Sequence, residues 1–434
     1  MTGKVLERES LHACLDSPVM GSITFLNEVM GRFPDAISFA PGAPHTAFFD
    51  DIDIPLHIAR YRRYLEEERS LTPAQVDRLL YQYGPSRGLI NELVAQALRT
   101  DHGIDVPEES VVVTVGCQEA ILLVLRTLFT SSRDLLAVAN PCFVGLTGAA
   151  NLLGIDTVAV DDTEECLDFA QLDEVCRRAR ASGSRIRAMY VAPDFSNPSG
   201  SRLGLAARHR LLAVAEREDF LLLEDNAYAF TATDAAALPP LKALPGGERV
   251  VHLGTFAKTC MPGARVGYAV ADQPVRQPSG GIGLLADELA TVKSMVTVNT
   301  SPISQAVIGG ILLQHRGSVA EAARAKSELY QRNLRVLLHA LDRHLGEGAR
   351  APAGVSWNRP RGGFFVRLRL TVPADEPLLE RSAKEFGVLW TPMSHFYIGS
   401  GGDHQLRLAC SYLDPEQIEE GVHRLARLLR AVCP

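Results

Sequence analysis

Lysine is scarce in this 434-residue chain. It supplies only six of the 44 basic residues, which are Lys4, Lys242, Lys258, Lys293, Lys326 and Lys384. A mechanism that depends on lysine therefore has few candidates. Basic residues are also outnumbered by acidic ones, which leaves a formal net charge of −7. Because nonspecific nucleic-acid binding relies on a basic surface, this charge argues against nucleic acid as a partner.

Several other features are absent, and each absence excludes a class of protein. The eight cysteines include no Cys-x-x-Cys pair, and none has the Cys/His spacing of a metal site. No apolar run approaches the roughly 18 residues of a membrane span. Residues 1–18 have no apolar core long enough for a signal peptide. We therefore expect a cytoplasmic protein with reduced thiols, no metal and no membrane association.

The composition is that of a folded globular protein. Hydrophobic residues make up 46% of the chain and charged residues 22%, whereas a disordered chain has fewer apolar residues and a larger charge imbalance. From about residue 60, helix-like segments alternate with short apolar runs at 110–115, 135–139, 186–192, 221–223 and 250–253. This alternation, with a helix expected at 205–218, predicts an α/β fold with a mostly parallel sheet flanked by helices.

The two ends of the chain have a different pattern. Residues 23–33 predict a short helix in an N-terminal arm, and residues 318–345 predict a long connecting helix. Two segments within 355–413 then alternate like antiparallel strands, and residues 415–432 predict an amphipathic helix. We expect residues 1–55 to form an N-terminal arm and part of a small domain. Residues 56–320 would form a large domain, and residues 321–434 the rest of the small α+β domain.

One lysine stands at a strand end with features of a binding site. Residues 250–268 (VVHLGTFAKTCMPGARVGY) run from an apolar strand to Lys258, and Arg265 follows seven residues later. A desolvated lysine has a lowered pKa and can form a Schiff base. Thr255 and Arg265 could hold a phosphate. A lone lysine of this kind is more often a surface-loop residue, so the interpretation depends on other segments.

Polar side chains also follow other predicted strands. Glu224 and Asp225 come directly after an apolar run, where the carboxyl ends of parallel strands bind ligands. A buried carboxylate there needs a cationic partner, such as a protonated pyridine nitrogen, although a helix N-cap or a solvated loop acid is the simpler alternative. Tyr228 could donate its phenol to a ring oxygen, and Asn197, in an Asn-Pro turn, could point at the same ring.

Three further segments offer contacts to an anionic, planar ligand. Gly116, Cys117 and Gln118 follow a strand and begin a helix, so the first backbone amides of that helix form an anion site. Phe143 follows a strand and a proline, where its ring could stack on a planar ligand or pack in the core. Arg407 lies within a strand pattern, and it could capture a carboxylate in bidentate fashion or face solvent at a sheet edge.

Together these motifs resemble the fold-type I pyridoxal-phosphate aminotransferases, and most closely the kynurenine/2-aminoadipate aminotransferase branch. The motifs occur in the family's order and comprise SNPSG (196–200), LEDNAY (223–228), GTFAK (254–258), GAR (263–265) and Arg407. The resemblance extends from ISFAPGAP to RLACSYL, which is nearly the whole chain. In addition, residues 11–29 and 82–88 resemble dihydroxyphenylglycine-type transaminases of antibiotic pathways.

The resemblance implies a role for each matched residue. Lys258 corresponds to the lysine that forms the Schiff base with pyridoxal 5′-phosphate and moves the proton between Cα and C4′. Asp225 corresponds to the acid that keeps the pyridine nitrogen protonated. Asn197 and Tyr228 would hold the ring 3-oxygen, and Phe143 would stack on the ring. The phosphate would be surrounded by Gly116, Cys117, Gln118, Thr255 and Arg265.

The resemblance also implies how substrate and a second subunit would bind. Arg407 corresponds to the residue that clamps the substrate α-carboxylate, with Asn197 close by. Gly42 corresponds to a glycine of the mobile N-terminal segment that closes over the substrate. Tyr83 resembles the tyrosine that reaches the phosphate of the neighbouring subunit, which implies a homodimer. The expected substrates are two small molecules, an L-amino acid and a 2-oxo acid, in a ping-pong reaction.

Three positions depart from the pattern of this branch. Cys117 and Ala257 stand where hydroxyl residues are usual near the phosphate, and Phe143 replaces a tyrosine. Two hydrogen bonds near the phosphate are therefore expected to be weakened or replaced. At position 143 the stacking ring is kept and the phenol hydroxyl is lost. None of the three changes removes a group that performs chemistry, so we expect an active enzyme.

Two alternatives share the same cofactor. A decarboxylase, lyase or oxidase of this fold would start from the same carbanion. A pyridoxal-phosphate-bound transcriptional regulator would carry a basic DNA-binding domain, whereas here fewer than 40 residues precede ISFAPGAP. Apolar residues near the N-terminus would suit an aromatic or long aliphatic substrate side chain, and the alternative is that they only pack in the core; they are Ile23, Phe25, Leu26, Phe39, Phe48 and Phe49.

Overall fold

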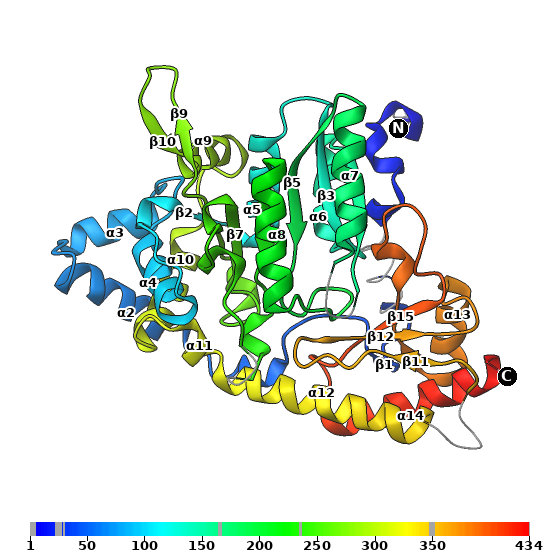
Figure 1. Cartoon of the computed structure of the whole chain (residues 1–434). Helices are drawn as coiled ribbons and strands as arrows, with labels where there is room; N and C mark the ends of the chain where they lie inside the picture. The colour runs from blue at the N-terminus through cyan, green and yellow to red at the C-terminus, as the bar shows by residue number, and fades with distance from the viewer. Residues whose placement is uncertain are drawn as a thin grey trace.

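The computed structural model describes residues 6–21, 28, 31–163, 167–233, 237–346 and 352–433. A seven-stranded sheet forms its centre (Figure 1), in the order β2-β8-β7-β6-β5-β3-β4. Strand β8 runs opposite to the other six strands, which are parallel to one another. The predicted mostly parallel sheet is therefore confirmed. The strands are β2 (Val111–Thr114), β3 (Asp134–Asn140), β4 (Thr157–Asp161), β5 (Arg185–Val191), β6 (Leu221–Asp225), β7 (Val250–Thr255) and β8 (Gly267–Val270).

Helices cover both faces of this sheet. Along β2, Val112 packs in the core on one face, whereas Val111 and Val113 pack in the core on the other, as the period-2 alternation of a strand requires. The first face is covered by α5 (Gly116–Leu128), α6 (Val144–Leu153) and α9 (Leu285–Val296). The second is covered by α2 (Ile54–Glu67), α3 (Pro73–Tyr81), α4 (Asn91–His102), α7 (Phe169–Ala181), α8 (Leu205–Glu218) and α10 (Pro302–Gln314). Burial on both faces explains why the strands are continuous apolar runs.

A second, smaller sheet forms a separate small domain. Its order is β11-β12-β15-β14, with all neighbours antiparallel, and it packs with α12 and α14, which lie side by side in Figure 1. The elements are α12 (Arg324–Leu345), β11 (Ser356–Trp357), β12 (Phe365–Arg369), α13 (Glu376–Arg381), β14 (Thr391–Pro392), β15 (Gln405–Ala409) and α14 (Pro415–Val432).

Segments from both ends of the chain pack together in this part of the structure. The short strand β1 (Ile37–Ser38) pairs in parallel with β13 (Val388–Leu389). Phe39 follows β1 and is fully buried in the core under α14. Three residues after Phe39, the carbonyl oxygen of Gly42 accepts a hydrogen bond from Lys258, so the segment passes from the small domain to the loop after β7. The short helix predicted at 23–33 falls mostly on residues outside the described ranges.

Two details differ from or add to the expected elements. The single helix expected at 318–345 is divided at Ala323 into α11 (Val319–Ala322) and α12, and the Asp101 carboxylate accepts hydrogen bonds from the backbone amides of Val319 and Ala320 at the start of α11. A hairpin of β9 (Pro274–Arg276) and β10 (Ile282–Leu284) projects from the body (Figure 1). Among the described helices, none is long and apolar enough to cross a membrane.

The loops after the parallel strands meet the small-domain sheet. The Ile398 amide donates a 3.0 Å hydrogen bond to the side chain of Asn140, at the end of β3. Gly200, in the loop after β5, lies so close to β12 that an added Cβ would stand 2.5 Å from the Phe365 carbonyl oxygen. The carboxyl ends of the strands, where α/β sheets bind ligands, are thus enclosed between two domains.

Candidate active site

A cavity of about 410 Å³ lies at these strand ends. It is lined by all of the predicted site residues except Gly116 and Tyr83, namely Gly42, Cys117, Gln118, Phe143, Asn197, Asp225, Tyr228, Thr255, Lys258, Arg265 and Arg407. These residues come from loops after β3, β5, β6 and β7, from the start of α5, from β15 and from the N-terminal segment. Segments far apart in the sequence therefore converge on one site.

Lys258 lies three residues beyond the end of β7 and points into the cavity. Its Nζ donates a 2.7 Å hydrogen bond to the carbonyl oxygen of Gly42. Burial and, after it, the positive charges of Arg265 and Arg407 together lower the pKa of Lys258 to about 8, while Asp225 opposes them. A fraction of this amine is therefore neutral near neutral pH, as a nucleophile or proton acceptor requires.

Asp225 ends β6 with a carboxylate that is only half satisfied. Its Oδ2 accepts a 2.5 Å hydrogen bond from the Tyr190 hydroxyl, whereas its buried Oδ1 has no hydrogen-bond partner in the described part of the chain. Burial raises the pKa of Asp225, and the Tyr190 hydrogen bond lowers it. A protonated ring nitrogen of a ligand would satisfy Oδ1 and keep the carboxylate ionised.

Glu224 precedes Asp225 but faces the other side of the sheet. Its carboxylate accepts hydrogen bonds from the amides of Leu241 (2.6 Å) and Lys242 (3.1 Å), and its Oε2 pairs with His252 Nδ1 at 2.9 Å. Because side chains alternate along a strand, only one of the two acids can reach the cavity. Glu224 holds the segment after β6 in place.

Arg407 is a buried cation on β15. Its Nη1 donates to Asn197 Oδ1 at 2.6 Å and its Nη2 to the Ala40 carbonyl oxygen at 2.7 Å. The guanidinium lies 4.5 Å from the ring centroid of Phe365 and 4.8 Å from that of Phe396. Burial lowers its pKa to about 10, so it stays charged at neutral pH. No described carboxylate pairs with it, and an anionic ligand would be the missing counter-ion.

Tyr228 lies beside this arginine. Burial raises the pKa of Tyr228, while the nearby Arg407 charge and a hydrogen bond with Asn197 lower it. The phenol therefore remains protonated at neutral pH and can donate. Asn197 thus contacts both Tyr228, which is expected to hold the ring oxygen, and Arg407, which is expected to hold the substrate carboxylate.

The start of α5 forms an anion site. No side chain caps its first turn, which leaves backbone N–H groups directed into the cavity. Gly116 has a φ of +72°, and an added Cβ would stand 2.6 Å from Nη2 of Arg265, so the guanidinium lies against the helix terminus. The Thr255 hydroxyl accepts from the Ala257 amide at 3.1 Å, so its proton remains for a ligand. These groups fit a phosphate.

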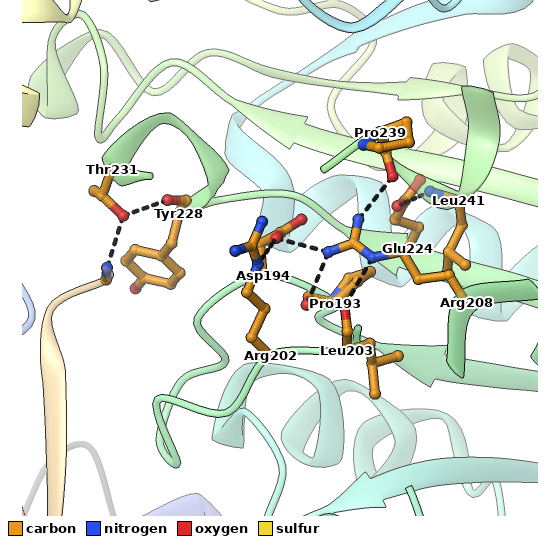
Figure 2. Close-up of polar contacts among 11 residues, drawn as sticks. Pro193, Asp194, Arg202, Leu203, Arg208, Glu224, Tyr228, Thr231, Pro239 and Leu241 are labelled. Atoms are coloured by element: carbon orange, nitrogen blue, oxygen red, sulfur yellow. Dashed lines mark hydrogen bonds and ion pairs between the residues drawn. The ribbon is translucent and has the colours of Figure 1, made fainter. Parts of the chain in front are cut away.

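The loops that carry these residues are held by buried polar contacts (Figure 2). The Thr231 hydroxyl donates to the Tyr228 carbonyl oxygen and accepts from the Gly363 amide, each at 2.7 Å. This links the loop after β6 to the small domain. Arg208 is fully buried and pairs with Asp194 at 2.7 Å. Asp194 is three residues before Asn197, so this ion pair fixes the loop that presents the amide.

Some cavity residues were not predicted from the sequence. They include Tyr190, Val144 and Phe396, together with Ala40, Pro41, Ala192 and Ala227. Their only signal was proximity to a predicted residue: Val144 follows Phe143, and Ala40 and Pro41 precede Gly42. Tyr190 and Phe396 had no local signal.

Of the apolar residues expected near the substrate, the three that the structure describes do not line the cavity. Phe39 lies in the small-domain core, Phe48 lies near Lys326, and Phe49 is 42% exposed. Ile23, Phe25 and Leu26 lie outside the described residues. Apolar character alone did not distinguish core packing from a ligand contact.

Tyr83 is 84% exposed and lies away from the cavity of its own chain. A large, exposed aromatic residue is unusual on a monomeric surface when other apolar residues surround it. Its expected contact with a neighbouring subunit stays a prediction.

Comparisons with known proteins show what this chain is similar to. The family model for aminotransferase class I and II matches residues 61–425. The chain is 48% identical to (S)-3,5-dihydroxyphenylglycine transaminase of Amycolatopsis orientalis, over 98% of this chain and 95% of the relative. It is 31% identical to 2-aminoadipate transaminase of Thermus thermophilus, over 92% and 91% of the two chains. The crystal structure of LysN, an α-aminoadipate aminotransferase from T. thermophilus complexed with N-(5′-phosphopyridoxyl)-L-leucine, matches with a TM-score of 0.78 at 29% identity, covering 98% of this chain and 99% of LysN.

Proposed function

The chain belongs to the aminotransferase class I and II family, and we propose that its preferred amino donor is an aromatic amino acid. It is a pyridoxal-5′-phosphate-dependent aminotransferase with the fold of fold-type I enzymes, and it moves an amino group between an amino acid and a 2-oxo acid. The observation that carries the assignment of roles is the convergence of Lys258, the half-satisfied Asp225 and the buried Arg407 on one cavity.

The residues of the cavity fit the cofactor. Lys258 would bind it covalently, Asp225 Oδ1 would accept from the ring nitrogen, and Asn197 and Tyr228 would hold the ring oxygen. The phosphate would lie at the start of α5, against Arg265. When bound, the cofactor supplies an electron sink that acidifies the substrate Cα–H bond.

Lys258 would also move the proton. Its lowered pKa of about 8 allows the neutral amine to accept a proton from Cα and return it on the adjacent cofactor carbon. Arg407 would hold the substrate α-carboxylate, and this contact fixes the orientation of the Cα–H bond toward Lys258. The apolar cavity wall excludes water from the exchange.

The character of the cavity favours an apolar substrate side chain. Its charged lining residues are Asp225, Lys258, Arg265 and Arg407, and each is assigned to the cofactor or to the α-carboxylate. The remaining wall includes Ala40, Pro41, Phe143, Val144 and Phe396. No described lining cation is left for a distal carboxylate. The 48% identical relative, named for a dihydroxyphenylglycine, supports an aromatic donor.

A donor panel tests this preference. Stopped-flow spectra of the bound cofactor would be recorded with phenylglycine, phenylalanine, leucine, glutamate and 2-aminoadipate. We expect the aromatic donors to show the highest kcat/KM, and a spectral change without 2-oxo acid product would argue against transamination. A clear preference for 2-aminoadipate would contradict the assignment of the cavity wall. The Phe396→Ala variant should lose activity mainly with aromatic donors.

The assembly is a homodimer in this proposal. Large apolar side chains are exposed on and beside α2, α3, α9 and α10, and they are Leu56, Tyr81, Tyr83, Met295, Val298 and Ile303. Helices α2 and α3 both contact α10, so several of these residues share one side of the molecule, and a second copy would cover them. Light scattering after gel filtration would give the mass of the assembly.

We also propose that the chain divides into residues 1–55, 56–320 and 321–434, as the sequence predicts, and that the protein is cytoplasmic.

A further inference from the structure

Two buried arginines stand side by side on the small-domain sheet. Arg367 on β12 is directly opposite Arg407 on β15, and each residue is 5% exposed. Directly opposed residues of an antiparallel pair point to the same face. Both guanidinium groups are therefore directed from the small domain toward the larger sheet. Only Arg407 lines the cavity.

Each arginine is bound to the larger domain by a different group. Arg407 donates to Asn197 at 2.6 Å. Arg367 Nη1 lies 3.7 Å from Oδ1 of Asp162, which follows β4, and the two side chains are 6% and 4% exposed. The other oxygen of Asp162 accepts 2.7 Å hydrogen bonds from the hydroxyls of Ser199 and Ser201. The loop that carries Asn197 therefore also carries the partners of Asp162.

Asn358 closes this arrangement from the small domain. Its Nδ2 donates to the Ser199 carbonyl oxygen at 2.7 Å, and its Oδ1 accepts from the Arg367 amide at 2.8 Å. The loop that carries Asn197 is thus held to the small domain directly at Asn197 and Ser199, and indirectly through Asp162.

The charges explain why Asp162 matters to Arg407. Two like charges on directly opposed residues repel each other, and the repulsion is stronger in a buried site than in water. Asp162 neutralises Arg367. Its Oδ1 accepts no hydrogen bond from the residues that the structure describes, so its contact with Arg367 is an ion pair without a hydrogen bond. Without it, Arg367 would be an uncompensated buried cation beside the substrate-binding arginine.

We propose that Arg367 and Asp162 are positioning residues that hold Arg407 against Asn197 and thereby set the affinity for the substrate carboxylate. The proposal rests on the function proposed above, because it assumes that Arg407 binds that carboxylate. Neither residue lines the cavity. Their effect passes through the paired strands β12 and β15 and through the loop from Asn197 to Ser201.

Calorimetry of the holoenzyme with 3-phenylpropionate tests the proposal, because this acid has a carboxylate and no amine to react. Asp162→Asn and Arg367→Gln should each weaken its binding about tenfold, which corresponds to about 1.4 kcal/mol. KM for an amino acid should rise by a similar factor, with kcat and the absorption spectrum of the bound cofactor nearly unchanged. Arg369→Gln, an exposed arginine on the same strand, is the matched control and should change neither value.

Two further variants separate the possible outcomes. The double variant Asp162→Leu/Arg367→Met removes both charges, and its affinity should lie closer to that of the wild type than either single variant does. If the single variants lower only the melting temperature and leave the affinity unchanged, the role is merely structural and the proposal is wrong. If Arg407→Gln also leaves the affinity unchanged, the carboxylate-binding role in the proposed function fails as well.

Discussion

The hydroxyl of Tyr190 donates a 2.5 Å hydrogen bond to Asp225 across neighbouring parallel strands. Both groups are buried. Burial raises the pKa of Asp225, and the Tyr190 hydrogen bond is the largest influence that lowers it. Because a hydrogen bond to the charged form favours ionisation, Tyr190 helps a buried acid to remain an anion. Asp225 can then stabilise a positive charge on a ligand ring.

Replacing Tyr190 with phenylalanine should therefore shift the acid side of the pH profile. Without the hydrogen bond, the pKa of Asp225 rises, so the carboxylate becomes protonated at higher pH. We expect the acid limb of log kcat/KM against pH to move upward by about one unit. Tyr268→Phe, another buried tyrosine, is the control. An unchanged acid limb in Tyr190→Phe would mean that Asp225 does not control activity in this range.

Lys258 should titrate near pH 8 in the apoenzyme. Its pKa is lowered to about 8 by burial first and by Arg265 second, whereas an ordinary lysine titrates near 10.4. The rate of reaction with pyridoxal, which lacks the phosphate, should rise with pH to a midpoint of about 8. Arg265→Gln removes a positive charge and should raise the midpoint, whereas the exposed Arg99→Gln should not. A midpoint near 10 in the wild type would show that the lysine is solvated.

The ends of the strands were predictable because their signals are local. A short apolar run predicts a buried strand, and a polar residue directly after it predicts the edge of the sheet at which that polar side chain lies. Asp225 and Lys258 were found in this way. Their convergence also follows, since the carboxyl ends of parallel strands share one edge.

Contacts between segments distant in the sequence were not predictable. Whether the Tyr190 side chain reaches Asp225 depends on the register of β5 against β6, in which Tyr190 is aligned with Leu223. The pairing of Arg367 with Asp162 depends on how two domains meet, and each residue alone is typical of a surface charge. The apolar residue Phe39 was expected near the substrate but packs in a core instead. Hydrophobicity indicates burial without indicating the neighbour.

A mixture of two inactive variants should recover activity if Tyr83 acts across the dimer. Lys258→Ala lacks the catalytic amine, and Tyr83→Ala lacks the residue proposed to reach the partner's site. In a hybrid dimer, one site would combine an intact Lys258 with an intact Tyr83 from the other chain. We expect up to about a quarter of wild-type activity after denaturation and refolding of an equal mixture, since half of the dimers are hybrids with one intact site each. No gain over the separate variants would place Tyr83 outside the site.

Cys117 offers a substitution that should improve cofactor binding. It is the second residue of α5, at the helix terminus that would hold the phosphate. Burial raises the pKa of its thiol far above the ordinary value, so the group stays neutral, and a thiol is a weak hydrogen-bond donor. Cys117→Ser places a stronger donor at the same position. A new hydrogen bond worth about 0.5–1.5 kcal/mol should lower the dissociation constant of pyridoxal phosphate roughly twofold to tenfold.

Absorbance titration of the apoenzyme measures this constant directly. Cys142→Ser is the matched control, because Cys142 is buried and does not line the cavity, and it should not tighten binding. If Cys117→Ser binds the cofactor no more tightly, the phosphate must be held by the backbone amides of α5 and by Arg265 without help from this side chain. Tighter binding would instead show that the thiol limits the affinity of this site, and it would place the phosphate at the start of α5.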